Sequence, residues 1–259
     1  MVLPSSRRLR AVGCAVGGGT VGDSGVASQP SFSAAELRES KASEPDFGQL
    51  YSQLETQGFC VVPNMLDVDM VSRLKRVTNE MVQAEPEEKS RRFRSQGSMV
   101  AVPGGVDTVP LDTIFGQLIT WKPALESLAR MGFVGPATFT DGYVISKPAH
   151  SPPLFWHYDW FSWDQRIDWR PRPVQVFFMY YLHDTSPANG CLRAIPGSHC
   201  ADNALVPLLG APHTVESSLA KDVTAVQYSR RPDECDVRCR AGDLLIGGCA
   251  RHALLGGVI

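Results

Sequence analysis

Residues 155–163 read Phe-Trp-His-Tyr-Asp-Trp-Phe-Ser-Trp, and one residue, Tyr158, separates His157 from Asp159. In a β-strand the side chains of residues i and i+2 project from the same face, so this imidazole and this carboxylate would lie side by side. Two histidines and one carboxylate form the facial triad that holds Fe(II) and leaves coordination positions open. His157 and Asp159 would be two of the three ligands of such a site.

Aromatic side chains surround this His-x-Asp pair. Four of the five tryptophans lie between residues 156 and 169, namely Trp156, Trp160, Trp163 and Trp169. They can line a dry pocket beside a metal, or they can pack in the core on both faces of a strand. Since a His-x-Asp pair also occurs by chance, the spacing alone leaves both interpretations open.

A second distinctive stretch follows at residues 174–199. It contains an Asn189-Gly190 turn, then Leu192-Arg193, and it ends in the tetrapeptide Pro-Gly-Ser-His that finishes at His199. A turn between two short apolar runs is typical of neighbouring strands. The histidine of the tetrapeptide is expected to shape a loop and not to bind metal.

Three further motifs accompany these two stretches. Lys147-Pro148 precedes the His-x-Asp pair, residues 242–247 read Gly-Asp-Leu-Leu-Ile-Gly, and residues 57–63 read Gln-Gly-Phe-Cys-Val-Val-Pro. In this order and spacing, over residues 47–252, the motifs resemble the phytanoyl-CoA dioxygenase family.

The resemblance implies a fold, a cofactor and a reaction. The fold would be mostly β with a helical N-terminal layer: a double-stranded β-helix (a cupin-like jelly roll), expected to be incomplete at its C-terminal end. The cofactors would be Fe(II) and the cosubstrate 2-oxoglutarate, with His157, Asp159 and His252 as the metal ligands and catalytic residues. The reaction would use O2 to hydroxylate a small organic or lipid-like substrate while 2-oxoglutarate becomes succinate and CO2.

The chain departs from the family pattern at the third ligand. His252 directly follows Ala250-Arg251, which is one residue earlier than the family's distal histidine. A β-bulge could absorb this shift, because the extra residue turns the side chain back to the same face.

A second departure concerns the cosubstrate. Family members carry an arginine after the distal histidine that pairs with the far carboxylate of 2-oxoglutarate, and residues 253–259 contain none. Lys147 is the expected cosubstrate contact, and Trp156, Trp160 and Arg193 are the expected substrate-pocket residues. A catalytically incomplete jelly-roll binding protein, or a truncated gene product, remains the alternative.

Periodicity and capping residues predict the elements around these motifs. Helices are expected over 47–57, from Asp67 or Asp69 to residue 85, and from Pro123 to Gly132. Strands are expected over 59–63, 138–147, 174–182, 191–195, 222–228, 235–240 and 243–247.

Composition limits the partners. The 259 residues carry 25 Lys+Arg against 27 Asp+Glu, a formal charge of −2, so binding nucleic acid through a broad basic face is not expected. No apolar run reaches the about 18 residues of a membrane-spanning helix. The seven cysteines contain no Cys-x-x-Cys pair and are expected to be reduced thiols. The expected partners are therefore a small-molecule substrate and O2; the oligomeric state cannot be predicted.

Residues 1–45 differ in texture from residues 46–259, which are expected to form the jelly-roll domain. Arg7, Arg8 and Arg10 come early, the first acid is Asp23, and glycine and serine are frequent. This composition predicts a disordered or targeting segment. The protein is accordingly expected inside the cell: in an organelle (mitochondrion or plastid) if the segment is a transit peptide, and otherwise in the cytoplasm.

Overall fold

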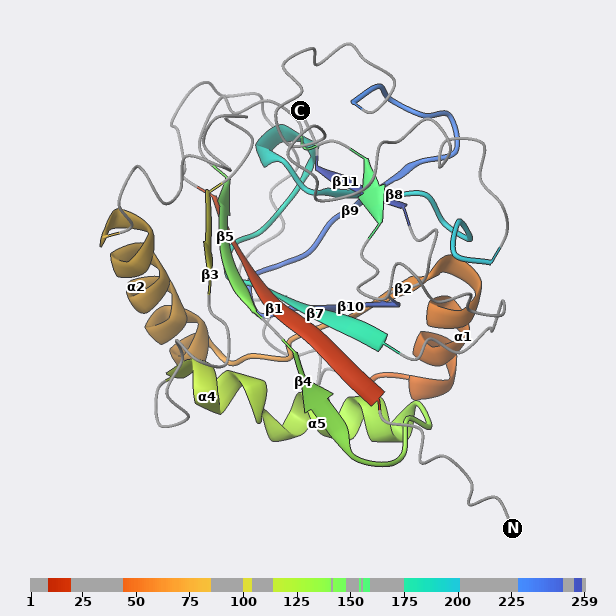
Figure 1. The fold of residues 1–259 in the computed structure, drawn as a ribbon, viewed down its shortest axis with the longest axis horizontal. Coiled ribbons are helices and arrows are strands. Elements are labelled where there is room, and N and C mark those ends of the chain that lie inside the picture. The colour runs from red at the N-terminus through yellow and green to blue at the C-terminus, as the bar shows by residue number, and fades with distance from the viewer. Residues whose placement is uncertain are drawn as a thin grey trace, which may run out of the picture.

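The computed structural model describes residues 9–19, 44–84, 100–103, 114–140, 142–147, 154, 156–158, 175–200, 228–248 and 254–257. The helices among them are α1 (Phe47–Gln57), α2 (Val68–Ala84), α4 (Ile114–Ile119) and α5 (Lys122–Arg130), with a short 3-10 helix at Pro187–Asn189 (Figure 1). None of the helices in the described part of the chain has the length and hydropathy of a membrane span.

The first two helices begin and end at the residues that the sequence predicts. The Asp46 carboxylate accepts a hydrogen bond from the backbone N–H of Gln49 at the start of α1, and Gly58 ends that helix with a φ of 90°. The Asp67 carboxylate accepts from the N–H of Met70 at the start of α2 in the same way. Local capping chemistry therefore sets these boundaries.

The strands form two sheets. The first has the order β2 (Phe59–Val62), β10 (Leu244–Gly248), β7 (Gln175–Tyr181), β1 (Leu9–Gly19), β5 (Tyr143–Lys147), β3 (Val100–Pro103), with β4 (Ala137–Phe139) also paired to β1. The second has the order β6 (His157–Tyr158), β11 (Leu254–Gly257), β8 (Leu192–Ala194), β9 (Cys235–Val237).

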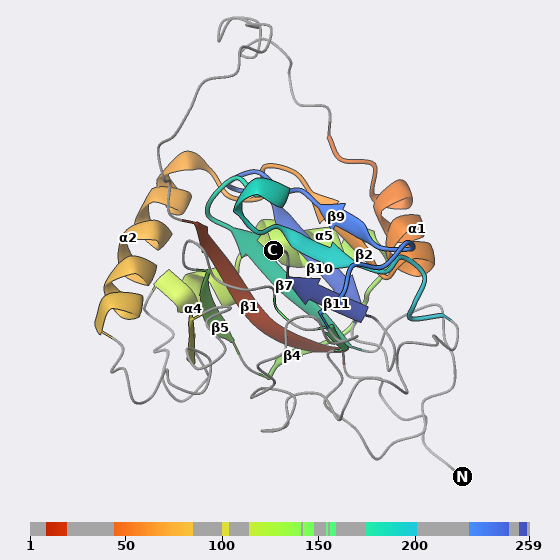
Figure 2. The ribbon, with the colours of Figure 1, turned by 90° about the horizontal axis from the view of Figure 1, so that it is seen from above.

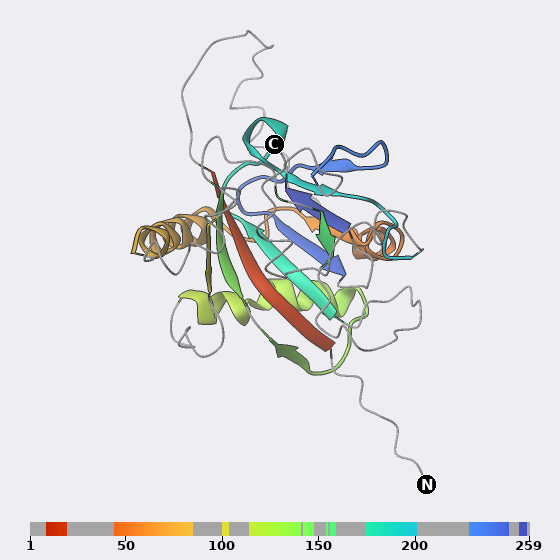
Figure 3. The same ribbon diagram turned by 45° about the horizontal axis from the view of Figure 1, so that its top comes forward.

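The first sheet lies between the helices and the second sheet. Along β7, Val176, Phe178 and Tyr180 join the core cluster that contains the helix residues, whereas Phe177 and Tyr181 join a cluster with Ala194 of the second sheet. Alternate residues of one strand thus fill two separate cores. Figures 2 and 3 show the same arrangement, with β9 and β11 on one side of the first sheet and α4 and α5 on the other.

Most expected strands are present. Residues 59–63, 174–182, 191–195, 235–240 and 243–247 contain β2, β7, β8, β9 and β10, and residues 138–147 contain parts of two strands, β4 and β5. The strand expected at 222–228 lies outside the described residues except for Tyr228, which is in a turn. Strands β3 and β11 and helix α4 were not predicted.

One stretch of the N-terminal segment is a strand: residues Leu9–Gly19 form β1. Their glycine-rich sequence gives little strand propensity, and the strand exists because two neighbouring strands offer it backbone partners. The expectation of a disordered or targeting segment over residues 1–45 stays a prediction, as does the division of the chain at residue 45.

Candidate metal and cosubstrate site

His157 begins β6, at the edge of the second sheet. Cross-strand register runs from His157 to Leu255 of β11, from Leu255 to Ala194 of β8, and from Ala194 to Cys235 of β9. Residues directly opposite each other in a sheet share a face. Ala194 packs in the cluster between the two sheets, so His157, half-buried, belongs to the same face, which we call the inner face.

The other predicted ligands cannot be placed beside His157. Asp159 and His252 lie outside the described residues, as does Trp160 of the predicted substrate pocket. Within the described ranges no three histidine, cysteine or acidic side chains are gathered closely enough to hold a metal ion. Of the expected triad, the structure places only the first member.

Trp156 and Arg193, both predicted to contact substrate, lie against each other. Arg193 is opposite Asp236 in the sheet register, one residue out of step with Ala194, and so projects from the outer face of the second sheet. Its guanidinium carbon lies 4.7 Å from the centre of the Trp156 ring, a cation–π contact. The two side chains are 0% and 1% exposed, so in this structure their surfaces are used by each other and by the surrounding protein.

An ion pair completes this buried cluster. Nη1 of Arg193 donates to Oε2 of Glu234 at 3.2 Å, and the Glu234 side chain is 4% exposed. Glu234 also accepts from the backbone N–H of Arg231 at 2.8 Å and pairs with the side chain of Arg230. The indole N–H of Trp156 donates to the Ser229 carbonyl at 3.0 Å. The residue before His157 is therefore fixed to β8 and to residues 229–234.

Glu234 and Ser229 are functional neighbours that reasoning from the sequence missed. Glu234 is 41 residues from Arg193 along the chain, and Ser229 is 73 residues from Trp156. Nothing in the local pattern of residues 229–234 differs from an ordinary polar turn. The odd feature that could have drawn attention is Arg193 in an apolar strand, because a buried arginine requires a counter-charge.

Lys147 is the last residue of β5 and is half-buried. Val144 of the same strand packs against Met81 and Val82 of α2. Strand alternation puts Lys147 on the opposite side, toward the second sheet. Burial, and to a smaller extent the charge of Arg193, lowers the pKa of Lys147 to about 8. A desolvated ammonium group in this place is suited to an anionic ligand.

The Pro-Gly-Ser-His tetrapeptide has a structural role. The imidazole Nε2 of His199 lies 2.9 Å from the carbonyl oxygen of Glu55 in the last turn of α1, and Gly197 N–H donates to the Gln57 carbonyl. These bonds satisfy carbonyl groups that a helix end leaves unpaired. A Cβ on Gly58 would lie 2.7 Å from the His199 ring, so a glycine there lets the ring approach. The expectation that His199 shapes a loop is confirmed.

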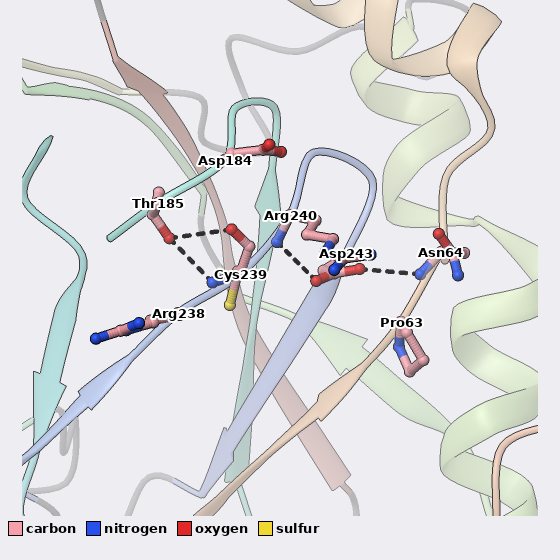
Figure 4. Close-up of a pocket in the computed structure, with 8 residues that line it drawn as sticks. All are labelled: Pro63, Asn64, Asp184, Thr185, Arg238, Cys239, Arg240 and Asp243. Atoms are coloured by element: carbon pink, nitrogen blue, oxygen red, sulfur yellow. Dashed lines mark hydrogen bonds between the residues drawn. The ribbon is translucent and has the colours of Figure 1, made fainter. Parts of the chain in front are cut away.

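A cavity of about 440 Å³ lies apart from these residues, where β2, β7 and β9 end (Figure 4). The Asp243 carboxylate accepts from the backbone N–H groups of Asn64 at 3.0 Å and Arg240 at 2.7 Å, and the Thr185 hydroxyl accepts from the N–H of Cys239 at 3.1 Å. These bonds connect neighbouring loops. The Gly-Asp motif at residue 243 therefore holds a turn together, and none of the predicted site residues lines this cavity.

Comparison with known proteins agrees with the motifs. The sequence profile of the phytanoyl-CoA dioxygenase family matches residues 54–253. No curated protein sequence matches the chain.

Three solved structures of similar fold contain 2-oxoglutarate. HygX from Streptomyces hygroscopicus, with nickel and 2-oxoglutarate bound, has a TM-score of 0.58 at 20% identity, covering 81% of this chain and 80% of that one. The epimerase SnoN, in complex with Fe3+, alpha ketoglutarate and nogalamycin RO, has 0.51 at 17%, covering 82% and 77%. EctD from S. alaskensis, with 2-oxoglutarate and 5-hydroxyectoine, has 0.50 at 16%, covering 85% and 73%. The matched profile spans most of the chain, and the chain therefore belongs to the phytanoyl-CoA dioxygenase family, enzymes of the iron- and 2-oxoglutarate-dependent oxygenase class.

Proposed function

We propose that this protein is a non-haem Fe(II)- and 2-oxoglutarate-dependent dioxygenase that hydroxylates a small organic or lipid-like molecule inside a jelly roll made of the two sheets. The observation that carries the proposal is the position of His157 on the inner face, in the space between the sheets where a dry reaction site belongs. The structures of similar fold hold small molecules beside 2-oxoglutarate: nogalamycin RO in SnoN and 5-hydroxyectoine in EctD.

The donor set suits Fe(II). His157 supplies an imidazole nitrogen from the inner face, Asp159 a carboxylate two residues on, and His252 a second imidazole, which together make a two-histidine, one-carboxylate set. When bound, iron with 2-oxoglutarate supplies the oxidising chemistry; the protein orients the ligands and excludes water. The cation–π contact and the ion pair of Arg193 hold Trp156, and with it the start of the strand that carries His157.

Lys147 is the group that would bind the far carboxylate of 2-oxoglutarate. It lies on a strand of the first sheet, directed toward the second, and its lowered pKa reflects the burial that makes a charge-assisted hydrogen bond strong. Carboxylate binding would restore the favoured charge of this ammonium group.

The first test is metal and cosubstrate binding. His157→Gln is expected to abolish the visible absorption that appears when 2-oxoglutarate chelates Fe(II) under anaerobic conditions, because one strong nitrogen ligand is lost. The matched control is His183→Gln, a partly buried histidine two residues after the end of β7.

Asp159→Ala is expected to abolish iron-dependent succinate formation from 2-oxoglutarate. Normal succinate yield from either ligand variant would contradict the assignment, and binding without turnover in the unmodified protein would favour the incomplete binding protein.

The third ligand has a sharper test. Leu255 is opposite His157 and Leu254 is opposite Tyr158, so in a regular strand an odd-numbered residue shares the face of His157. His252 as a ligand therefore requires one irregular residue before Leu254. If that irregularity exists, His252→Ala loses metal affinity and adding Ala253→His does not restore it. Unchanged metal affinity in His252→Ala, together with higher affinity when Ala253→His is added to the unmodified chain, would show that the strand is regular and that His252 is not a ligand.

A further inference from the structure

The N-terminal strand β1 is held in the middle of the first sheet in an unusual way. It lies between β7 and β5, as Figures 1 and 2 show, and it is parallel to both. Each pairing between the other described strands is antiparallel. The strand is thus a parallel strand within a sheet whose other described strand pairs are antiparallel.

The same residues of β1 pair with β7 on one side and with β5 on the other. Ala15 is opposite Met179 of β7 and Tyr143 of β5, and Gly17 is opposite Tyr181 and Ile145. Without β1, two central strands would each lose the partners of one edge, since neighbouring strands lie only about 4.8 Å apart and β5 and β7 are two spacings apart. Unpaired strand edges readily accept another strand.

The place that β1 fills is a regular position in the proposed jelly roll, and the inference rests on that proposed fold. A jelly roll has eight strands, four in each of two sheets. The second sheet has four strands. In the seven-stranded first sheet, β10, β7, β1 and β5 are consecutive, with β2 and β3 at the two edges and β4 also paired to β1.

The sequence of β1 gives it little hold of its own. Leu-Arg-Ala-Val-Gly-Cys-Ala-Val-Gly-Gly-Gly contains four glycines, and the pairing with β7 shifts register between Val12 and Cys14. Glycine weakens a strand and permits such a bulge. The backbone pairing with β5 and β7 is therefore what holds this strand in the sheet.

We propose that the position between β5 and β7 is a strand-binding slot whose ligand is an extended peptide, and that residues 9–19 occupy it as an intramolecular strand that the folded protein retains. Removal of the N-terminal segment opens the slot. A transit peptide cleaved at about residue 45 would then remove part of the folded sheet, so processing before Leu9 is compatible with the structure and processing after Gly19 is not.

Hydrogen exchange on the full chain tests the occupancy. Amides of residues 9–19 are expected to be protected as the amides of β7 are. Ala15→Pro, which removes a donor in the middle of the strand, is expected to lower Tm by about 5–10 °C, whereas Ala27→Pro, in the same segment but outside β1, leaves Tm unchanged. Free exchange over 9–19 together with equal Tm values for the two variants would overturn the proposal.

A peptide tests the slot. A chain beginning at residue 44 is expected to have a lower Tm, and a synthetic peptide of residues 7–21 is expected to bind it in a 1:1 ratio and to restore Tm, whereas the same peptide with Ala15→Pro is not. Absence of peptide binding by a folded truncated chain would refute the slot. If the truncated chain does not fold, hydrogen exchange over residues 9–19 of the full chain provides the test instead. Binding of iron and 2-oxoglutarate by the full chain is measured in a separate experiment, so the slot and the proposed activity can be refuted independently.

Discussion

The Glu234 carboxylate shows how a single residue can hold three distant parts of the chain together. It binds Arg193 of β8, and Arg193 in turn stacks on Trp156, the residue before His157. Both charges are almost completely buried, and the ion pair between them offsets part of the cost of that burial. Positioning of the first metal ligand is thereby connected to a side chain that touches neither metal nor substrate.

Removing that carboxylate is expected to be costly. Glu234→Ala should lower the free energy of unfolding by about 3–5 kcal/mol, because it leaves Arg193 buried without its counter-charge. Glu80→Ala is the matched control, since Glu80 pairs with Arg76 on the exposed surface of α2 with side chains 63% and 68% exposed, and should change stability by less than about 0.5 kcal/mol. Denaturant unfolding of the two variants measures the difference; similar values would show that the buried pair is not stabilising.

As the proposed contact to the cosubstrate, Lys147 should make the affinity for 2-oxoglutarate depend on pH. Its folded-state pKa of about 8 lies below the ordinary 10.5. The folded protein therefore carries the cost of the buried charge below pH 8 and loses that cost as pH rises toward 10.5. A carboxylate ligand needs the charged form, so 2-oxoglutarate affinity should fall by up to about tenfold per pH unit above 8.

Calorimetric titration of the nickel-loaded protein between pH 7 and pH 9.5 measures this effect. Lys147→Met should bind 2-oxoglutarate weakly with no such decline, and Lys122→Met, at an exposed position in α5, should behave as the unmodified protein. An affinity that is constant with pH in the unmodified protein would exclude Lys147 as the contact.

At the scale of elements, glycine residues, which have no β-carbon, allow aromatic rings to pack directly on the backbone of a strand and of a helix end. A Cβ on Gly247 of β10 would lie 2.2 Å from the Phe177 ring of β7, which covers that backbone inside the interior between the sheets. The ring of His199 similarly lies over Gly58 at the end of α1. In both places an aromatic ring fills the volume that a β-carbon would take.

Gly247→Ala is therefore expected to destabilise the fold by about 1–3 kcal/mol, since Phe177 must leave its rotamer or the strands must separate. Gly48→Ala, in the first turn of α1, is the comparison. Its β-carbon would lie 3.2 Å from a carboxylate oxygen of Asp46, and because a small shift of that side chain relieves the contact, this variant should cost less than Gly247→Ala. Thermal unfolding compares the two. Equal stability of Gly247→Ala and the unmodified chain would mean that the ring relocates without cost.

At the scale of the whole molecule, the first sheet separates two buried regions: an apolar core on its helix side, and the space between the two sheets on its other side. Its helix side buries a large apolar cluster that fixes α1, α2, α4 and α5 to the sheet, and its other side faces the second sheet and His157. Placing β1 in the centre of this sheet makes the N-terminal segment part of the wall of the proposed reaction site. The cellular location of the protein stays a prediction, which the N-terminal sequence of the mature protein would test.

The amino-acid sequence by itself determined the local features: the ends of α1 and α2 through Asp46, Gly58 and Asp67, the strands around the Asn-Gly turn, and the family through its motifs. Each depends on residues close together in the chain. Only the tertiary structure decided that β1 lies between β5 and β7, that Trp156 and Arg193 pack on each other, and that Glu234 compensates the charge of Arg193. Backbone pairing and buried charge compensation are satisfied by any suitable partner in space, and no local pattern specifies which partner that will be.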